Sequence, residues 1–149
     1  MKYTILLLLT FSFCKNDLNF NKRLVESFCE KIILNDNITF YDTTKYVRYS
    51  SEFLDSKNKH EIVMSILKNL RTQLSKNNND YEIINHEKLL KTNNFKVLKF
   101  SNEYKKLNTY HLISRDSIIT SFIIRDRKII SFSYNIIKNI DQVKTPLIL

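Results

Sequence analysis

The chain contains no glycine, and this absence excludes several kinds of functional site. Loops that wrap a phosphate group need glycine, because its backbone approaches a ligand closely and adopts positive φ without strain. A P-loop, a dinucleotide-binding fingerprint and a nucleophile elbow are therefore excluded by composition. Asparagine is the next most tolerant residue at positive φ. It clusters where we expect turns, at positions 35–37, 77–80 and 93–94.

Proline is also scarce and tryptophan is absent, but apolar residues are plentiful. Hydrophobic residues make up 43% and aromatic residues 12% of the 149 positions, which indicates a folded domain rather than a disordered chain. The length is typical of one domain.

The formal net charge is +9, but the lysines are scattered among asparagines and isoleucines without a dense basic block. We interpret this charge as a bias of composition, and nucleic acid is not an expected partner. Tyr41, Tyr46, Tyr49 and Arg48 have the chemistry to stack on bases or sugars. Because no basic groove accompanies them in the sequence, we interpret them as packing residues.

The first 13 residues have the pattern of a secretory signal peptide. Lys2 gives a positive start, and an apolar stretch follows over residues 4–13. A membrane-spanning helix needs roughly 20 apolar residues, so this stretch fits the apolar core of an export signal instead. The alternative is a buried N-terminal helix or strand, although the run of aliphatic residues has no polar face.

Cys14 follows the apolar stretch directly, and here the sequence resembles a bacterial lipoprotein precursor. Ser12 and the position of the cysteine match that family, whereas Phe13 stands where a small residue is usual. The resemblance implies cleavage before Cys14 and a diacylglycerol on its sulfur. Because Lys15, not Asp, comes next, it implies the outer rather than the inner membrane. Plain secretion is the alternative that Phe13 leaves open.

These features divide the chain into a signal peptide (1–13), a lipid attachment site and tether (14–19), and one domain (20–149). Within the domain the only cysteine is Cys29. It lies in helical phase with buried-type residues, so we predict a small buried hydrophobe rather than a reactive or intermolecular thiol.

The first part of the domain has helical periodicity. Apolar residues recur every three or four positions over residues 20–34 and again over 58–75. The second helix has one stripe of six expected core residues: Ile62, Val63, Ile66, Leu67, Leu70 and Leu74. Between the two helices we expect an extended connector over 38–41, and then a brief helix, capped by Asp42 or Thr43, through Val47 and Phe53.

After residue 80 the period becomes that of strands. The expected strands are 81–86, 96–101, 108–114, 118–125 and 128–134, with tight turns at 115–117 and 126–127. Connections this short require antiparallel pairing. The predicted fold class is therefore α+β, with N-terminal helices packed on a meander sheet of four or five strands.

The last hairpin, residues 121–132, resembles the closing hairpin of the NTF2-like superfamily. Its turn is Asp126-Arg127, with Arg127 where that family usually has glycine. The resemblance implies a sheet curved into a cone with a cavity.

His111 is the one catalytic candidate, because a histidine on a cavity-lining strand has a suitable pKa for a general base. The alternative is a strand histidine with a structural role, since no carboxylate is evidently placed to orient it. His60 and His86 show no metal-ligand spacing, and Asp116 and Asp126 fit turns. We expect no metal and no cofactor.

The sequence thus predicts a small exported envelope protein, lipid-anchored through Cys14, with a non-catalytic binding domain. Its partner would be a protein, a peptide or a small apolar ligand in the concavity of the sheet. Two alternatives remain: an NTF2-like enzyme that uses His111, and an immunity-type lipoprotein that neutralises a toxin.

Overall fold

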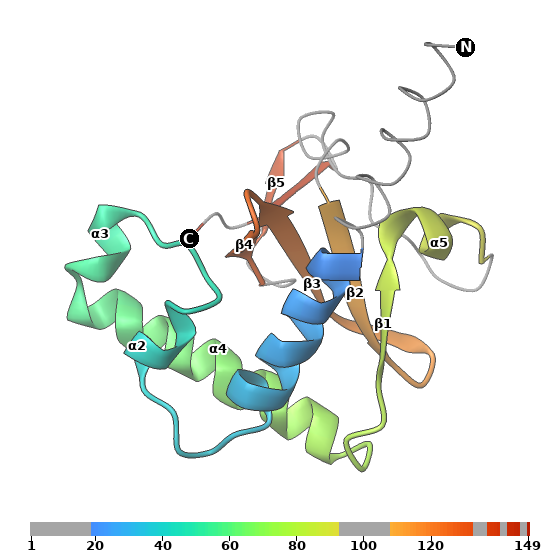
Figure 1. The fold of residues 1–149 in the computed structure, drawn as a ribbon, viewed down its shortest axis with the longest axis horizontal. Coiled ribbons are helices and arrows are strands. Elements are labelled where there is room, and N and C mark those ends of the chain that lie inside the picture. The colour runs from blue at the N-terminus through green and yellow to red at the C-terminus, as the bar shows by residue number, and fades with distance from the viewer. Residues whose placement is uncertain (1–18, 93–107, 133–136, 141–142, 147–148) are drawn as a thin grey trace, which may run out of the picture.

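The computed structural model describes residues 19–92, 108–132, 137–140, 143–146 and 149. Helices come first and an antiparallel sheet follows, which confirms the predicted α+β class (Figure 1). The expected strand 96–101 and Cys14 lie outside the described residues.

The first helix covers residues 19–33 and confirms the predicted helix 20–34. It is α-helical over 19–28 and continues as the π-helical segment η1 (Cys29–Ile33). Its buried side chains are Val25, Phe28, Cys29, Ile32 and Ile33. Phe20 is the exception, with 41% of its surface exposed. Figure 1 shows this helix in front of the sheet and crossing the long helix described below.

The next segment corrects two predictions. Residues 38–41 are not an extended connector, because α2 (Phe40–Thr43) begins at Phe40 with Thr39 as its N-cap. The Asp42 carboxylate accepts hydrogen bonds from the backbone N–H of Thr39 at 3.0 Å and from its hydroxyl at 2.9 Å. Asp42 is therefore the third helical residue of a capping box with Thr39 rather than the N-cap itself. A separate short helix, α3 (Ser51–Leu54), follows.

The long helix α4 (Lys57–Ser75) confirms the predicted helix 58–75. Val63, Leu67, Leu70 and Leu74 are buried, and each stabilises the fold by roughly 1.5–3 kcal/mol before entropy. Ile62 is 48% exposed, so its assignment to the core was wrong. It lies about 100° around the helix from Val63, and the buried stripe does not extend that far.

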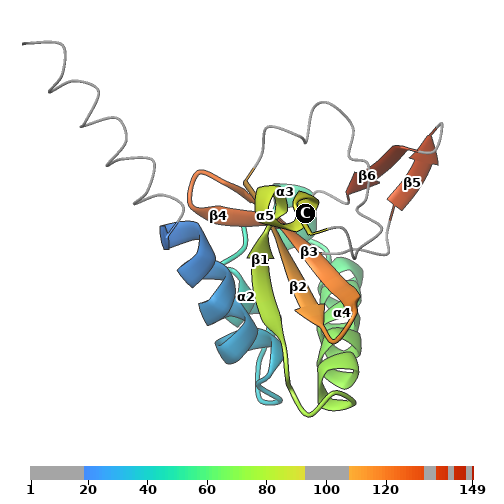
Figure 2. The same ribbon diagram turned by 90° about the vertical axis from the view of Figure 1, so that its right-hand side faces the viewer.

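The sheet is a four-stranded antiparallel meander in the order β1-β2-β3-β4. Its strands are β1 (Glu82–Asn85), β2 (Asn108–Ser114), β3 (Ser117–Arg125) and β4 (Lys128–Ser131). A helix that the periodicity did not indicate, α5 (His86–Leu90), follows β1 directly (Figure 2). Strands β5 (Ile137–Ile140) and β6 (Val143–Pro146), also unpredicted, form a second two-stranded sheet.

Without glycine, other residues adopt the left-handed backbone conformation at the turns. Asn78 (φ 56°) and Asn79 (φ 57°) do so after α4, as the asparagine cluster predicts. Arg115 (φ 53°), Asp126 (φ 49°) and Arg127 (φ 59°) do so in the two hairpins. Left-handed backbone costs a non-glycine residue roughly 1–2 kcal/mol, so the strand pairing on either side must offset this strain.

The main core lies between the helices and one face of the sheet. Phe28 is at its centre, with ring centroids 5.9 Å from Phe122 and 5.2 Å from Phe132. On the other face of the sheet Ile84 and Ile113 pack with Leu89 of α5 in a separate cluster. The side chains in the middle of β2 and β3 are thus buried on both faces.

Candidate binding surface

One imidazole ring joins α2, α3 and α4 at the surface. The His60 ring stacks on the Phe40 ring with centroids 3.7 Å apart and planes 11° apart. Tyr41 meets the same imidazole edge-on, at a centroid distance of 5.9 Å. His60 Nε2 lies 2.9 Å from the carbonyl oxygen of Leu54. We call Phe40, Tyr41, Leu54 and His60 the aromatic surface.

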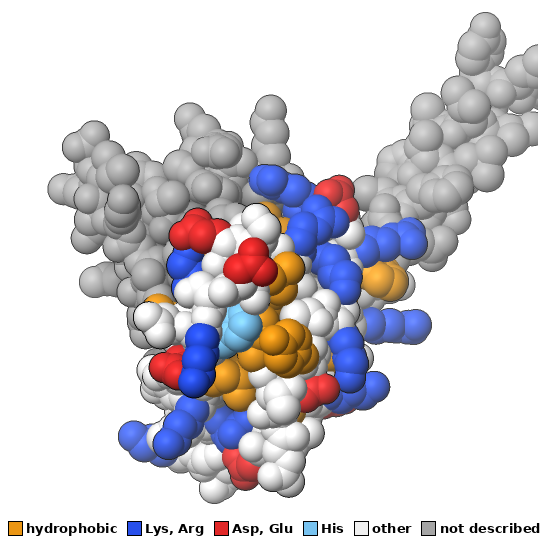
Figure 3. Space-filling view, turned by 90° about the vertical axis from the view of Figure 1, so that its left-hand side faces the viewer, with side chains coloured by type: hydrophobic (Ala, Val, Ile, Leu, Met, Phe, Trp, Pro, Cys, Tyr) orange, Lys and Arg blue, Asp and Glu red, His pale blue; other side chains and the backbone are white. Residues whose placement is uncertain are grey.

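The outer side chains of the aromatic surface are exposed to solvent, and its inner side chain is held in place by packing. Tyr41 is 68% exposed and Leu54 43% exposed, whereas Phe40 is buried. Beneath Phe40, the Tyr49 ring lies at 4.8 Å, and its hydroxyl shares a 2.8 Å hydrogen bond with Thr43. Burial raises the pKa of Tyr49, so this hydroxyl stays protonated. Figure 3 shows apolar side chains beside a histidine on this face.

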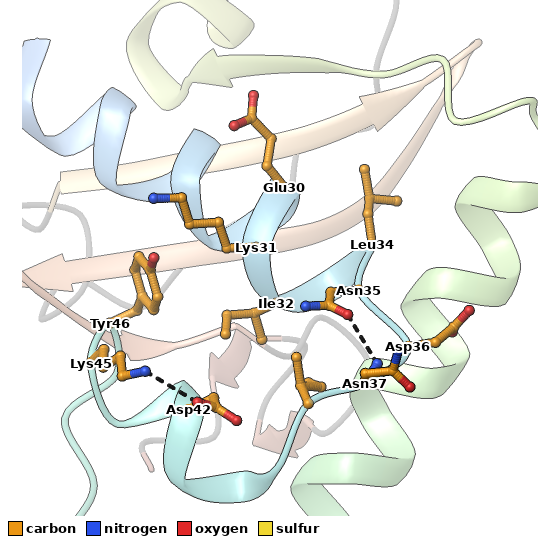
Figure 4. A pocket seen from close by; sticks show the side chains of 11 residues that line it. Glu30, Lys31, Ile32, Leu34, Asn35, Asp36, Asn37, Asp42, Lys45 and Tyr46 are labelled. Carbon is orange, nitrogen blue, oxygen red and sulfur yellow. Dashed lines mark hydrogen bonds and ion pairs between the residues drawn. The ribbon is translucent and has the colours of Figure 1, made fainter.

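A polar groove of about 700 Å³ lies next to α2 (Figure 4). Its walls come from the end of the first helix, from the loop 34–38 and from Asp42, Lys45 and Tyr46. Hydrogen bonds from Thr39 and the Lys45 ammonium 3.1 Å away lower the pKa of Asp42 to about 2. Since Glu30 and Lys31 also line the groove, it presents charges of both signs.

A second groove, of about 540 Å³, lies on the other side of the same loop. Asp36 and Ile38 line both grooves. Met64 and Lys68 of α4 also line it, one and two turns after His60, so the groove continues the aromatic surface along α4.

Arg71 holds the loop between the grooves in place. Its Nε donates a 2.6 Å hydrogen bond to the carbonyl of Ile33, and its Nη1 lies 2.6 Å from the Asp36 carboxylate. The guanidinium also donates to the carbonyl of Asn35. Arg71 therefore satisfies carbonyl groups that the end of the first helix leaves without intrahelical partners.

His111, the predicted catalytic candidate, lies in a chain of polar groups inside the molecule. Its Nδ1 is 2.8 Å from the Ser121 hydroxyl on β3, and its Nε2 is 2.9 Å from Nδ1 of His86 on α5. Desolvation, and then the neighbouring His86, lowers the pKa of His111 to about 3. His111 is fully buried and Ser121 nearly so. In the described part of the chain, neither of them lines the two grooves.

The other candidate residues lie where they have structural roles. Cys29 is fully buried, and burial raises the pKa of its thiol. Asp126 lies in a hairpin turn, as predicted, and its carboxylate is 3.0 Å from Arg48 Nη1. No group of three or more metal-ligating side chains occurs among residues with described positions. None of the helices in that part of the chain combines the length and apolar character needed to cross a bilayer.

The fold defines a small α+β protein in which a four-stranded meander carries helices on its main core face. A scan against models of protein families and searches of curated proteins and solved structures found no match for this chain.

The sequence did not single out His60 or Arg71, although both organise this surface. His60 contacts Phe40, 20 positions away in the sequence, and Arg71 contacts Ile33, 38 positions away. Helical phase was the one available signal, since positions 60, 64, 67 and 71 lie along one side of α4.

Proposed function

We propose that this chain is an exported envelope protein, lipid-anchored through Cys14, whose domain binds a partner protein without catalysis. The N-terminal pattern supports the first half of this proposal. The aromatic surface supports the second half, because its exposed residues Tyr41 and Leu54 both contact His60, and exposed tyrosines are frequent in protein interfaces.

The main observation in favour of a binding role is that the exposed Tyr41 ring is held in place by packing. The ring is 68% exposed, yet it packs against His60, which is stacked on the buried Phe40. A side chain already held in place loses little conformational entropy on binding. Tyrosine is also among the residues that contribute most to protein interfaces.

The neighbouring grooves favour a protein over a small apolar ligand. Small-molecule sites are enclosed and mostly apolar, whereas the larger groove is lined by Glu30, Lys31, Asp42 and Lys45. Charged and polar residues around an aromatic centre are typical of the rim of a protein interface. A toxin neutralised by an immunity-type lipoprotein is one class of partner with this chemistry.

The binding half of the proposal is tested by site-specific photocrosslinking in intact cells. A photoreactive phenylalanine at position 41 is expected to give a discrete adduct that Leu54→Ser weakens. The matched control is the same probe at Leu90, which is 56% exposed but lies on α5. Equal adducts from both positions would show that Tyr41 is not part of a specific interface. A self-adduct would identify a second copy of the chain as the partner.

The location half is tested by labelling with radioactive palmitate. The wild-type chain is expected to incorporate label, and Cys14→Ser is expected to lose it. Cys29→Ser is the control and should keep the label, because this buried thiol is not the proposed acceptor. Unchanged labelling of Cys14→Ser would end the anchoring proposal.

A second candidate function is an enzyme in which His111 acts as general base. The 2.8 Å contact between His111 and Ser121 favours it, because a serine beside an imidazole is a potential nucleophile. A fluorophosphonate probe would then label Ser121, and His111→Gln would abolish that labelling. Absence of labelling on the native chain would remove this candidate.

A further inference from the structure

Basic side chains gather where the described chain begins. The first turns of the helix 19–33 carry Lys22 and Arg23, and the β3–β4 hairpin carries Arg125, Arg127 and Lys128. Figure 2 shows the start of this helix next to that hairpin at one end of the molecule. On the face drawn in Figure 3, Lys and Arg side chains gather along the upper right edge.

Two contacts join these elements into one surface. The Arg127 guanidinium lies over the Phe20 ring, 5.1 Å from its centroid. Arg48 reaches Asp126 across the hairpin at 3.0 Å, with both side chains about half exposed or more. We call the following residues the cationic platform: Phe20, Lys22, Arg23, Arg48, Arg125, Arg127 and Lys128.

Basic side chains predominate on the platform among the described residues. Of its six basic residues, Lys22 pairs with Glu26 and Arg48 with Asp126, and the Lys128 ammonium donates to the carbonyls of Thr44 and Lys45. The opposite end of the molecule holds the end of the first helix and the α4–β1 turn. There Glu30, Asp36, Asp80 and Glu82 accompany Lys31, Arg71 and Lys76. The described domain is therefore positive at one end and close to neutral at the other.

We propose that the cationic platform rests on the anionic phospholipid headgroups of the membrane to which the chain is anchored. This inference rests on the proposed lipid on Cys14, which stands five residues before Asn19. Five residues span at most about 18 Å, so an anchor at that position holds the platform close to the headgroups. Arginine suits this partner because its planar fork donates two hydrogen bonds to one phosphate.

The platform would orient the domain on the membrane. The two acyl chains of a diacylglycerol already give stable anchoring, so the basic surface is not needed to hold the chain there. Attraction between exposed arginines and anionic lipid acts over about one Debye length, roughly 8–10 Å at physiological salt. Phe20, 41% exposed beneath Arg127, adds an aromatic side chain of the kind that partitions into the interface.

The test uses the proposed mature chain, residues 14–149, carrying Cys14→Ser, so that neither an acyl chain nor the apolar leader contributes. Its partition is measured by flotation with vesicles of phosphatidylethanolamine and phosphatidylglycerol, and with vesicles of phosphatidylcholine alone. Two charge-reversal variants are compared: Arg23→Glu with Arg127→Glu in the platform, and Lys57→Glu with Lys76→Glu at the two ends of α4. Both pairs change the net charge equally, and all four positions are exposed. Circular dichroism confirms that each variant is folded.

We expect phosphatidylglycerol to strengthen partitioning of the parent chain at least about tenfold, and high salt to remove that gain. The platform variant should lose the gain and the α4 variant should keep most of it. Equal losses in both variants would show that total charge matters and the platform does not. Partitioning that is independent of phosphatidylglycerol would reject the inference outright.

The outcome for the platform is separable from the outcome for the anchor. The vesicle measurement needs no acyl chain, and palmitate labelling of wild-type protein needs no platform. If the wild-type chain is labelled but its Cys14→Ser form partitions independently of phosphatidylglycerol, the anchoring proposal stands and the platform proposal is rejected. If the wild-type chain is not labelled but the Cys14→Ser form still binds these vesicles, the cationic surface stands and the assignment to an anchored envelope protein is rejected.

Discussion

The Nδ1 atom of His86 lies 2.9 Å from the Nε2 atom of His111, so two imidazoles share one hydrogen bond between α5 and β2. One of these two nitrogens must carry a proton and donate it in the hydrogen bond, and the other must act as the acceptor. Two neutral imidazole rings can form this arrangement. Desolvation is the main cause that lowers the pKa of both histidines, to about 3 for His111. The pair is therefore neutral in the folded protein near pH 7.

This pair predicts a loss of stability in mild acid. The unfolded chain protonates histidine near pH 6.5, whereas folded His111 resists protonation down to about pH 3. The unfolded state thus binds more protons in that window, and the free energy of unfolding falls as pH decreases from 6.5. One such histidine contributes up to about 1.4 kcal/mol per pH unit. Urea unfolding at pH 7.5, 6 and 5 measures the slope.

His111→Gln is the control for the acid effect, because its amide keeps a polar group without titrating. The variant should be less stable at pH 7.5 but flatter between pH 6.5 and 5. A slope equal to that of the wild type would assign the effect to other groups.

Replacing Arg71 by methionine should destabilise the fold by about 2 kcal/mol, the usual loss for hydrogen bonds to a charged donor. The guanidinium is mostly buried, and its removal leaves the Ile33 carbonyl without this donor. Arg48→Met is the matched control, because the exposed pair with Asp126 should contribute less than about 1 kcal/mol. Similar losses in chemical denaturation would contradict the capping role.

Arg115→Gly should stabilise the β2–β3 hairpin by up to about 1 kcal/mol. Arg115 has φ 53°, where glycine avoids the strain of a side chain. The matched control is Asp116→Gly at the next position, which is not among the positive-φ residues and should be neutral or destabilising. A lower melting temperature for Arg115→Gly than for Asp116→Gly would refute this assignment.

Cys29 should not react with Ellman's reagent in the folded protein at pH 8. Its side chain is fully buried, and burial raises the pKa of the thiol away from the reactive thiolate. Urea should release one reactive thiol at this position, measured by mass spectrometry of the labelled peptide. Fast labelling of the native chain at Cys29 would restore the reactive-thiol interpretation.

The sequence by itself determined the elements whose physical cause is local. Helical periodicity over 20–34 and 58–75 predicted the helices that the structure has at 19–33 and Lys57–Ser75, and alternation with tight turns predicted β2, β3 and β4. These predictions succeed because one face of each element must be buried, which fixes the period of apolar residues. The N-cap in this segment was predicted wrongly. Thr39 caps α2, and Asp42 occupies the third helical position, for which aspartate is as well suited as for a cap.

Only the tertiary structure decided which polar groups meet. A two-residue turn at Arg115-Asp116 alone would pair His111 with Thr120. The β-bulge between Leu112 and Ile113 shifts the register by one residue and places Ser121 opposite His111 instead. The Phe40–His60 stack and the Arg71–Ile33 hydrogen bond likewise depend on how α2, α4 and the first helix pack. Local periodicity specifies which face of an element is buried, but the residues that meet across elements depend on register and packing, which the whole fold sets.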